Sequence, residues 1–293
     1  MNDLGVLTLA TRSDYQKAIG LALSLKVSNP GVPCAVACEA GLRALLEPYF
    51  DHVIDQFKEV KGFEHKVHLD QYTPFESTLF MDSDILVFKP LKPYMDSWAG
   101  HAYTACGLLV TEGFSCFGFD RKRAMERIGA DTFVQIDGAG HALFHKPECL
   151  PVFERARQIT AEYADYGGGA KYADEDVMNY VMTEMNLPPM PYGDFFSRYC
   201  SGVPGTMKMD ARSATCNFIS TTTGLRFSPC IMHFAAREAP FSYTTQLFLL
   251  FRKFGVPYDG LLRILCVDFN MREIKPRLRW MKKYFFWSSR AKK

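Results

Sequence analysis

The chain has 293 residues, of which 48% are hydrophobic and 23% are charged. This composition is typical of a globular protein and excludes a disordered or fibrous one, and the length predicts one α/β unit of two tightly joined halves. A formal net charge of +2 offers no strong attraction to nucleic acid, so we expect no such partner. The charge is uneven, because residues 270–293 carry nine Lys and Arg against one acid. A basic C-terminal segment therefore follows an acidic body.

Three features of the sequence predict a cytoplasmic protein. The N-terminal stretch MNDLGVLTLATRSDY has neither a basic start nor a long apolar core, so we expect no secretion signal. No uninterrupted run of about 18 apolar residues is present, since charged residues break the best candidate at 247–267. The nine cysteines are odd in number and lack CxxC spacing, which argues against a disulfide framework or a zinc site.

The elements of the first hundred residues alternate between strand and helix patterns. Strands are expected at 4–11, 32–38, 52–57 and 77–88, and helices from a cap at Ser13 to about residue 27, at 40–50 and near 64–70. This alternation predicts βαβ units, a mainly parallel sheet flanked by helices, and a ligand site beyond the carboxyl ends of the strands. The second half is less regular, with strand-like pieces at 104–111, 115–119 and 140–145, helices at about 148–165 and 174–185, and a Pro-rich loop at 187–194.

Two aspartates, two positions apart, interrupt the apolar run FMDSDILVF. An extended backbone would point Asp82 and Asp84 to the same side, and burying both carboxylates without a partner would be costly. Two convergent carboxylates suit a divalent cation, which could hold a diphosphate and neutralise it as a leaving group. A tight turn uses the same residues and is the alternative, although the apolar flanks favour the metal site.

Three segments together carry a family likeness: VLTLATRSDYQKAIGLALSLK, STLFMDSDILVFKPL and IMHFAAREAPFSY. The first contains TLxTxxxY, and the last contains HFxxxxxPxxY, which begins at His233. Lys66 stands sixteen residues before Asp82. In these motifs, and from about residue 4 to residue 245, the chain resembles glycosyltransferase family 8, which includes glycogenin and bacterial lipopolysaccharide galactosyl- and glucosyltransferases.

The resemblance implies a GT-A (Rossmann-like) fold and a retaining, metal-dependent transfer of galactose or glucose from a UDP-sugar to a glycan or glycolipid. Mn²⁺, or Mg²⁺, would be the ion, and cell-surface polysaccharide or lipopolysaccharide synthesis the setting. The catalytic domain would span 1–245, with a nucleotide-binding half at 1–110 and an acceptor-side half at 111–245. Residues 246–293 would form a helical, basic and aromatic docking region.

The resemblance also implies a role for each residue that matches a family motif. The nucleotide would be bound by Leu9, Thr11, Tyr15 (stacked on the uracil), Asp82 (at the ribose) and the backbone of Ser83. The metal would be held by Asp82, Asp84 and His233. Lys66 would face the diphosphate or sugar, and it would form the catalytic set with Asp174 and Glu175, which lie beside the donor sugar.

The chain departs from the family pattern at several of these positions. The late motif of the family reads HxxGxxKPW, whereas Ala236 and Ala239 here replace the Gly and the Lys. The diphosphate thereby loses a cation, which Arg237 could supply. The middle motif reads DGAG, around Gly138, where the family has an Asn, and Glu175 takes the place of a Gln. The choice of sugar and the level of activity are therefore open.

Each candidate residue also has an interpretation without a ligand. Tyr15 could be a core aromatic, Lys66 a solvated lysine, His233 a core histidine and Asp174 a helix N-cap. For the whole chain, the alternative is a noncatalytic nucleotide-sugar-binding or scaffold protein with a degenerate site. A sugar-phosphate nucleotidyltransferase ranks third, because the Gly-rich basic loop it needs is missing after the first strand.

The C-terminal segment has an interfacial pattern. In a helix that starts near Phe269, Ile274, Leu278, Met281 and Phe285 form one apolar stripe flanked by basic residues. This pattern, which resembles the C-termini of family members that build lipopolysaccharide, predicts peripheral docking on the anionic inner face of a membrane. The alternative is that the stripe packs on the body while the charges are solvated.

Overall fold

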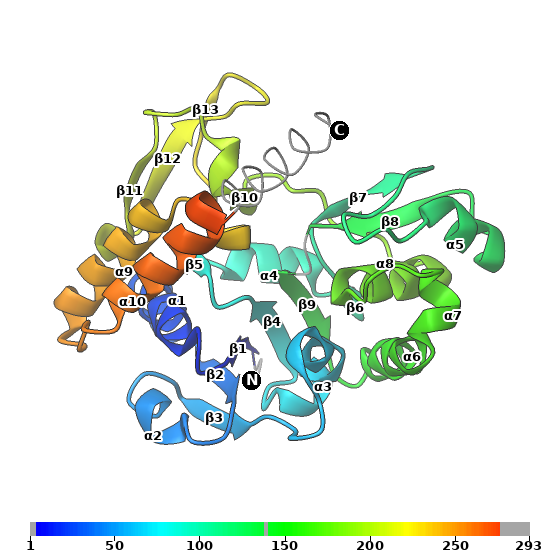
Figure 1. Ribbon diagram of the computed structural model, residues 1–293, viewed down its shortest axis with the longest axis horizontal. Coiled ribbons are helices and arrows are strands. Elements are labelled where there is room, and N and C mark those ends of the chain that lie inside the picture. Colours follow the sequence, from blue (N-terminus) through cyan, green and yellow to red (C-terminus); the bar gives the residue numbers. More distant parts are fainter. Residues whose placement is uncertain (1–3, 138–139, 276–293) are drawn as a thin grey trace, which may run out of the picture.

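The computed structural model describes residues 4–137 and 140–275 (Figure 1). Its main sheet has six strands in the order β3-β2-β1-β4-β9-β6. Four of them are parallel, namely β1 (Leu4–Ala10), β2 (Cys34–Cys38), β3 (His52–Asp55) and β4 (Ser77–Met81). The antiparallel strand β9 (His141–His145) pairs with β4, and the short β6 (Tyr103–Thr104) pairs with β9. The expected mainly parallel sheet is confirmed.

Side chains alternate between the two faces of this sheet, and each face has its own apolar core. Val6 and Ala10 belong to one core, which α1, α9 and α10 cover. Leu7 and Phe80 belong to the other, which η1, α3, α6 and α8 cover. These helices are α1 (Tyr15–Ser28), η1 (Gly62–His68), α3 (Leu69–Tyr72), α6 (Leu150–Ala161), α8 (Asp174–Glu184), α9 (Pro240–Phe254) and α10 (Leu261–Phe269). Figure 1 shows the sheet between the two sets of helices.

The structure also contains smaller sheets outside the main one. β5 (Ile85–Val87), β14 (Ile231–His233) and β10 (Phe196–Arg198) form one of them, and β11 (Lys208–Asp210), β12 (Thr215–Ile219) and β13 (Arg226–Phe227) form another. β7 (Gly107–Val110) pairs with β8 (Phe133–Ile136). The remaining helices are α2 (Arg43–Leu46), α4 (Lys92–Trp98), α5 (Arg121–Ile128), α7 (Tyr163–Gly167) and the short η2 (Tyr199–Ser201), η3 (Ala211–Ser213), η4 (Ala235–Arg237) and η5 (Asn270–Ile274).

Four local expectations are wrong. The stretch 104–111 is not one strand, because it divides into β6 and β7, which belong to different sheets. The run 77–88 is not one strand, because it breaks at residues 82–84 into β4 and β5, which belong to different sheets. Residues 115–119 form turns, in which the Ser115 hydroxyl accepts hydrogen bonds from the backbone of Phe117 and Phe119. Ser13 does not cap α1; Asp14 precedes the helix, and its carboxylate accepts hydrogen bonds from the backbone and hydroxyl of Thr11.

Helix α9 runs across the domain boundary expected at residue 245, and the division of the chain at that point stays a prediction. The helix expected near Phe269 begins earlier, as α10, and continues through η5 to Ile274. Residues 276–293, which carry most of the predicted interfacial stripe, lie outside the described part, as does Gly138. Among the described residues, no helix has the length and apolar character needed to cross a membrane.

Candidate active site

The Asp82–Asp84 segment forms a tight turn that links two sheets. β4 ends at Met81 and β5 begins at Ile85, whose backbone N–H donates to the carbonyl of Asp82 at 3.1 Å. The turn expected as the alternative is therefore present, and it brings the two carboxylates to one place, whereas the metal site stays a prediction. Neighbouring elements fix the turn: the N–H of Asp82 donates to the carbonyl of Gly140 at 2.7 Å, and the N–H of Phe234 donates to the carbonyl of Asp84 at 3.0 Å.

His233 completes a group of three potential metal ligands. It ends β14, which pairs with β5 so that His233 lies opposite Ile85. One ligand atom each from Asp82, Asp84 and His233 lies within 4.8 Å of the others. The Nε2 atom of His233 lies 3.1 Å from Oδ1 of Asp84 and 3.8 Å from Oδ2 of Asp82. His233 is buried, whereas the two aspartate side chains are 23% and 22% exposed, so a ligand can reach them.

Lys66 reaches the same site from the face of the sheet that η1 covers. It lies on η1, and its buried Nζ is 2.9 Å from Oδ1 of Asp82 and 3.1 Å from Oδ2 of Asp174. Burial lowers the pKa of Lys66, but the charges of Asp174 and Asp82 outweigh it, so the pKa is raised and the ammonium stays charged. The interpretation of Lys66 as a solvated surface lysine is wrong.

The electrostatics of the cluster favour a bound cation. Three carboxylates, those of Asp82, Asp84 and Asp174, face one ammonium, which leaves two negative charges uncompensated when His233 is neutral. Burial raises the pKa of Asp82 against the opposing charges of Lys66 and His233. Burial lowers the pKa of His233, but Asp84 outweighs this effect, and the resulting pKa is raised. The raised pKa of His233 thus reflects the negative charge around it, which would also attract a divalent ion.

The residues present fit a divalent transition metal. Two carboxylates and one imidazole form the mixed oxygen and nitrogen set that suits Mn²⁺ better than an all-oxygen shell would. Gly140 leaves the room for this set, because a Cβ at that position would lie 2.6 Å from Cε1 of His233 and 3.3 Å from Oδ2 of Asp82. The sequence did not single out Gly140, although a glycine directly before β9 was a usable signal.

Asp174 and Glu175 begin α8, beside the cluster. Ala173 occupies the N-cap position and Asp174 pairs with Lys66, so the interpretation of Asp174 as a cap is wrong. Burial raises the pKa of Glu175 to about 7, and the charges of Asp176, Asp174 and Asp137 add to this effect. Glu175 is therefore about half protonated at neutral pH.

The expected nucleotide-binding residues gather at the carboxyl end of β1. Leu9, Thr11 and Tyr15 are half-buried, and Tyr15 packs against the apolar core beside α1. Because β1 and β4 are parallel neighbours, this end of β1 lies at the same edge of the sheet as Asp82. Ser83 accepts a hydrogen bond from the Tyr243 hydroxyl through its carbonyl, at 3.3 Å. The contacts of these residues with a nucleotide stay predictions.

Arg237 follows the ligand strand in η4, where its φ of +63° is left-handed. Its Nε lies 3.2 Å from Oδ1 of Asp268, on α10. The role of Arg237 at the diphosphate stays a prediction. Ala239, which stands where the family has Lys, also has a left-handed φ, of +44°.

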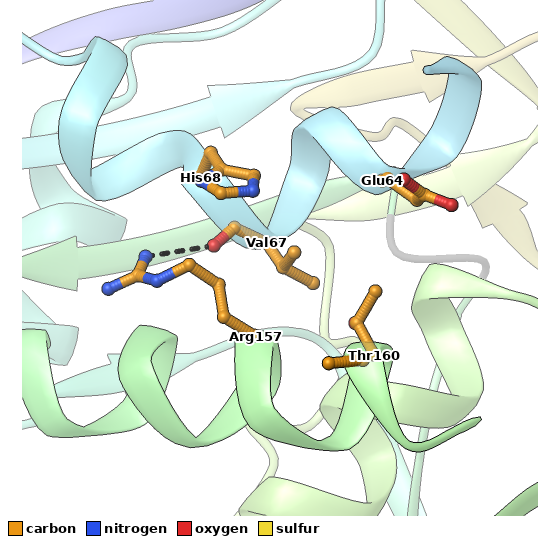
Figure 2. Close-up of a pocket in the computed structure, with 6 residues that line it drawn as sticks. Glu64, Val67, His68, Arg157 and Thr160 are labelled. Carbon is orange, nitrogen blue, oxygen red and sulfur yellow. Dashed lines mark hydrogen bonds between the residues drawn. The ribbon is translucent and has the colours of Figure 1, made fainter. Parts of the chain in front are cut away.

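A separate cavity of about 400 Å³ lies between η1 and α6. Figure 2 shows side chains that line it, with Arg157 on α6 pointing toward the backbone of Val67 on η1. Arg157 donates from Nη1 to the carbonyl of Val67 at 3.1 Å and to the carboxylate of Asp70 at 2.8 Å. These contacts join α6 to η1, the helix that carries Lys66, and to Asp70 on α3. The cavity is lined by Glu64, Val67, His68, Arg157, Thr160 and Ala161, and so it is distinct from the metal cluster.

Comparison with known proteins identifies the fold. No protein-family model matches the sequence, and no curated protein matches it either. Among solved structures, LgtC, a galactosyltransferase in complex with donor and acceptor sugar analogues, is 14% identical with a TM-score of 0.54, over 92% of this chain and 97% of LgtC. An active-site glutamine-to-glutamate mutant of LgtC is 15% identical with a TM-score of 0.53, over 79% of this chain and 87% of that chain.

The bifunctional glycosyltransferase WbbM is 12% identical with a TM-score of 0.55. The match covers 90% of this chain but only 51% of WbbM, so the chain spans about half of that protein. These similarities, together with the mostly parallel sheet flanked by helices, confirm the GT-A fold expected from the sequence.

Proposed function

We propose that the protein is a metal-dependent, retaining glycosyltransferase that moves galactose or glucose from a UDP-sugar to a glycan or glycolipid acceptor. The observation that carries this proposal is the convergence of Asp82, Asp84 and His233 within 4.8 Å, with Lys66 beside them, on a GT-A fold. LgtC, which shares the fold, is a galactosyltransferase crystallised with donor and acceptor sugar analogues. The setting we propose is the synthesis of cell-surface polysaccharide or lipopolysaccharide.

In this proposal, Asp82, Asp84 and His233 hold Mn²⁺ or Mg²⁺. When bound, the ion would supply positive charge to the diphosphate that leaves with UDP. Lys66 adds a compact ammonium that can bind phosphate oxygens, and its pairing with Asp82 and Asp174 keeps it in place. A front-face transfer with retention needs positioning and electrostatics more than a separate general base, because a phosphate oxygen can take the acceptor proton.

We assign Asp174 and Glu175 to the donor sugar. Asp174 is buried and fixed by Lys66, so its second oxygen has a defined place. Glu175 stands where the family has Gln, and its pKa of about 7 means that much of the population carries a carboxylic acid at neutral pH. A protonated glutamate can donate one hydrogen bond, as the glutamine amide does. Glu175 therefore resembles the glutamine of the family most closely below about pH 7, where its side chain is mostly protonated.

Turnover of a panel of UDP-sugars tests the proposal. UDP release is measured with and without Mn²⁺ for the wild type, for Asp84→Asn and for Asp96→Asn, an exposed carboxylate that pairs with Lys92 on α4. We expect metal-dependent release from one sugar, a loss of at least about 100-fold in Asp84→Asn, and no change in Asp96→Asn. Undiminished release in Asp84→Asn would contradict the assigned site.

The second candidate is a noncatalytic nucleotide-sugar-binding protein, and it is favoured by Ala239, which stands where the family has a lysine for the diphosphate. Binding of UDP without turnover of any sugar, even with mixed cell-envelope glycans as acceptors, would support this candidate.

We also propose that the C-terminal region docks on an anionic membrane surface. On α10, Leu261, Ile264 and Asp268 are buried against the body. Other positions of α10 and η5 expose apolar residues, namely Leu262, Val267, Met271 and Ile274. Basic Arg263, Arg272 and Lys275 are exposed as well. Exposed apolar and basic residues on the same helix are typical of a helix that lies in a membrane interface.

Vesicle co-sedimentation tests the docking of this region. The full chain is compared with a chain that ends at Lys275, which keeps every described element, on vesicles with and without anionic lipid. We expect the full chain to bind anionic vesicles more strongly than the shortened chain and to release them at high salt. Equal binding of the two chains would contradict a role for residues 276–293.

A further inference from the structure

Another cavity, of about 280 Å³, lies between α9, β11 and η2 (Figure 1), and we call it the α9 pocket. Its volume is just below the range of about 300–1,000 Å³ that is typical of sites for drug-sized ligands, so it suits one ring rather than a whole nucleotide. None of the residues expected to bind the nucleotide lines it. Its wall combines aromatic, thioether, hydroxyl and amide side chains, among them Tyr199, Met209, Phe241, Ser242 and Gln246.

Phe241 gives the α9 pocket an exposed aromatic surface. Its side chain is 58% exposed, and its ring meets that of Phe269 nearly edge-on, with 5.3 Å between the centroids. Phe269, at the end of α10, thus limits how the exposed ring can turn. The face of an aromatic ring carries negative charge and attracts C–H groups. A hexose presents C–H groups on one side of its ring, so the exposed face of Phe241 is a suitable platform for a sugar.

The polar groups of the pocket suit the hydroxyls of a sugar. The hydroxyl oxygens of Tyr199 and Ser242 lie 3.1 Å apart, and either group can be the donor. Whichever donates, the other keeps its hydrogen for a ligand, and both oxygens can accept. The amide of Gln246 is fixed inside the protein, because it accepts from the N–H of Ala211 at 2.8 Å and donates to the carbonyl of Met209 at 3.1 Å. This part of the wall is therefore preformed.

The charge and polarity of the lining exclude other ligand classes. The described residues that line the α9 pocket include no Lys, Arg, His, Asp or Glu, so the pocket offers no counter-charge to a phosphate or a carboxylate. A purely apolar lipid chain would leave the hydroxyls of Tyr199 and Ser242 without a partner other than each other. A neutral ligand with an apolar face and a rim of hydroxyls, such as a hexose ring, matches both parts of the lining.

One aromatic ring separates the α9 pocket from the metal-binding turn. The ring of Phe234, the residue after the metal ligand His233, lies 5.6 Å from that of Tyr199 and 4.6 Å from that of Tyr243, measured between centroids. The hydroxyl of Tyr243 in turn donates to the carbonyl of Ser83 at 3.3 Å. The pocket is therefore near enough to the metal cluster for one short sugar chain to occupy both.

We propose that the α9 pocket is an acceptor subsite, which binds a neutral hexose of the acceptor at a distance from the hydroxyl that receives the transferred sugar. Phe241 lies against the C–H face of this hexose, and Tyr199 and Ser242 bind its hydroxyls. The proposal rests on the proposed function, because it takes the acceptor to be a glycan. It also narrows that function, since the acceptor must then contain more than one sugar.

Saturation-transfer NMR tests the pocket without donor or metal. The probes are lactose, cellobiose and maltotriose, together with dodecyl maltoside, which joins a sugar to an alkyl chain. We expect saturation of the ring C–H protons of at least one oligosaccharide and a Kd that rises about 5- to 10-fold in Phe241→Ala. Phe241→Tyr, which keeps the ring, should restore the affinity. Tyr258→Ala, which removes a 47% exposed aromatic ring outside the pocket, is the control and should bind as the wild type does.

Three results of the binding experiment would overturn the proposal: no saturation of any sugar, saturation of the alkyl chain of dodecyl maltoside alone, or equal affinity in wild type and Phe241→Ala. The second result would assign the pocket to a lipid chain. Thermal unfolding is measured alongside. Because the ring of Phe241 is mostly exposed, we expect Phe241→Ala to unfold near the wild-type temperature, so a loss of binding reports on the pocket.

Turnover separates a failure of the subsite from a failure of the proposed function. With UDP-sugar and Mn²⁺ present, Phe241→Ala should raise the KM for the oligosaccharide acceptor about 5- to 10-fold and leave its kcat unchanged. The KM for the methyl glycoside of the terminal sugar, which is too short to reach the pocket, should not change. An equal rise for both acceptors would overturn the subsite and leave the function standing. Oligosaccharide binding that depends on Phe241, without turnover of any UDP-sugar by the wild type, would overturn the function and keep the pocket as a sugar site.

Discussion

Replacing Glu175 with glutamine is expected to stabilise the protein more at alkaline than at acid pH. Burial and the neighbouring carboxylates of Asp176, Asp174 and Asp137 raise the pKa of Glu175 from 4.5 to about 7. The folded protein therefore keeps a proton that the unfolded chain has already released at pH 5 or 6. Stability falls as the pH rises between these two pKa values, and the full cost is present above the higher one. Glutamine cannot ionise, so the variant does not incur this cost.

The two pKa values set the size of the effect. The rise from 4.5 to about 7 corresponds to about 3 kcal/mol of destabilisation well above pH 7, since one pKa unit is worth about 1.4 kcal/mol. At about pH 5.5 only about 1.4 kcal/mol of this cost is present, and at about pH 8 nearly all of it is. The stabilisation by Glu175→Gln should therefore be about 2 kcal/mol larger at pH 8 than at pH 5.5. Effects on hydrogen bonding that do not depend on pH cancel in this difference.

Urea unfolding followed by circular dichroism at the two pH values measures this difference. Glu126→Gln, which alters an exposed carboxylate on α5, is the matched control and should have the same small effect at both pH values. If Glu175→Gln changes the free energy of unfolding equally at pH 5.5 and pH 8, then Glu175 is not held in the anionic, buried environment described above, and its role as a proton-bearing partner of the donor sugar loses its basis.

Three further outcomes follow from the site. Gly140→Ala should weaken Mn²⁺ binding by about 10-fold or more, because the new Cβ would meet His233. Gly100→Ala, where a Cβ has open space, is the control. Equal Mn²⁺ affinities of the two variants would contradict the tight packing at Gly140. Lys66→Met should lower the free energy of unfolding at pH 7 by about 3–5 kcal/mol, since it leaves two carboxylates without their buried partner, and a loss below about 1 kcal/mol would contradict that pairing. UDP-sugar turnover should decline as the pH rises through about 7 and Glu175 ionises. Glu175→Gln should remove this decline. If the variant and the wild type have the same pH profile of turnover, the role of Glu175 is contradicted.

The main sheet could be predicted because its strands are apolar and its connections are regular. Leu4–Ala10 and Ser77–Met81 are nearly continuous apolar runs, as buried parallel strands are. Periodicity could not reveal the break at 82–84, because residues on both sides of it are equally apolar. α5 and β8 were missed for the opposite reason. The helix RKRAMERI is mostly charged and buries only Ala124 and Met125, so it has little apolar periodicity.

The candidate site could be predicted only in part. Asp82 and Asp84 are a local pattern, whereas Lys66 and His233 taken singly resemble a surface lysine and a core histidine. Only their spacing in the family motif predicted that they belong to the site, because their neighbours in the sequence give no such indication. Contacts between distant helices were not predicted either: the ion pair between Lys17 of α1 and Asp268 of α10 joins residues 251 positions apart. Such a contact depends on how α10 packs against α1, and no local pattern in the sequence encodes it.

The most direct test of the central claim is a calorimetric titration of Mn²⁺ in the presence of UDP, with wild type and Asp84→Asn compared side by side. A metal-dependent nucleotide site at Asp82, Asp84 and His233 predicts one Mn²⁺ per chain in the wild type, tighter binding with UDP than without it, and a loss of at least about 10-fold in Asp84→Asn. Equal Mn²⁺ affinity in the two proteins, or no effect of UDP on Mn²⁺ binding, would contradict the account.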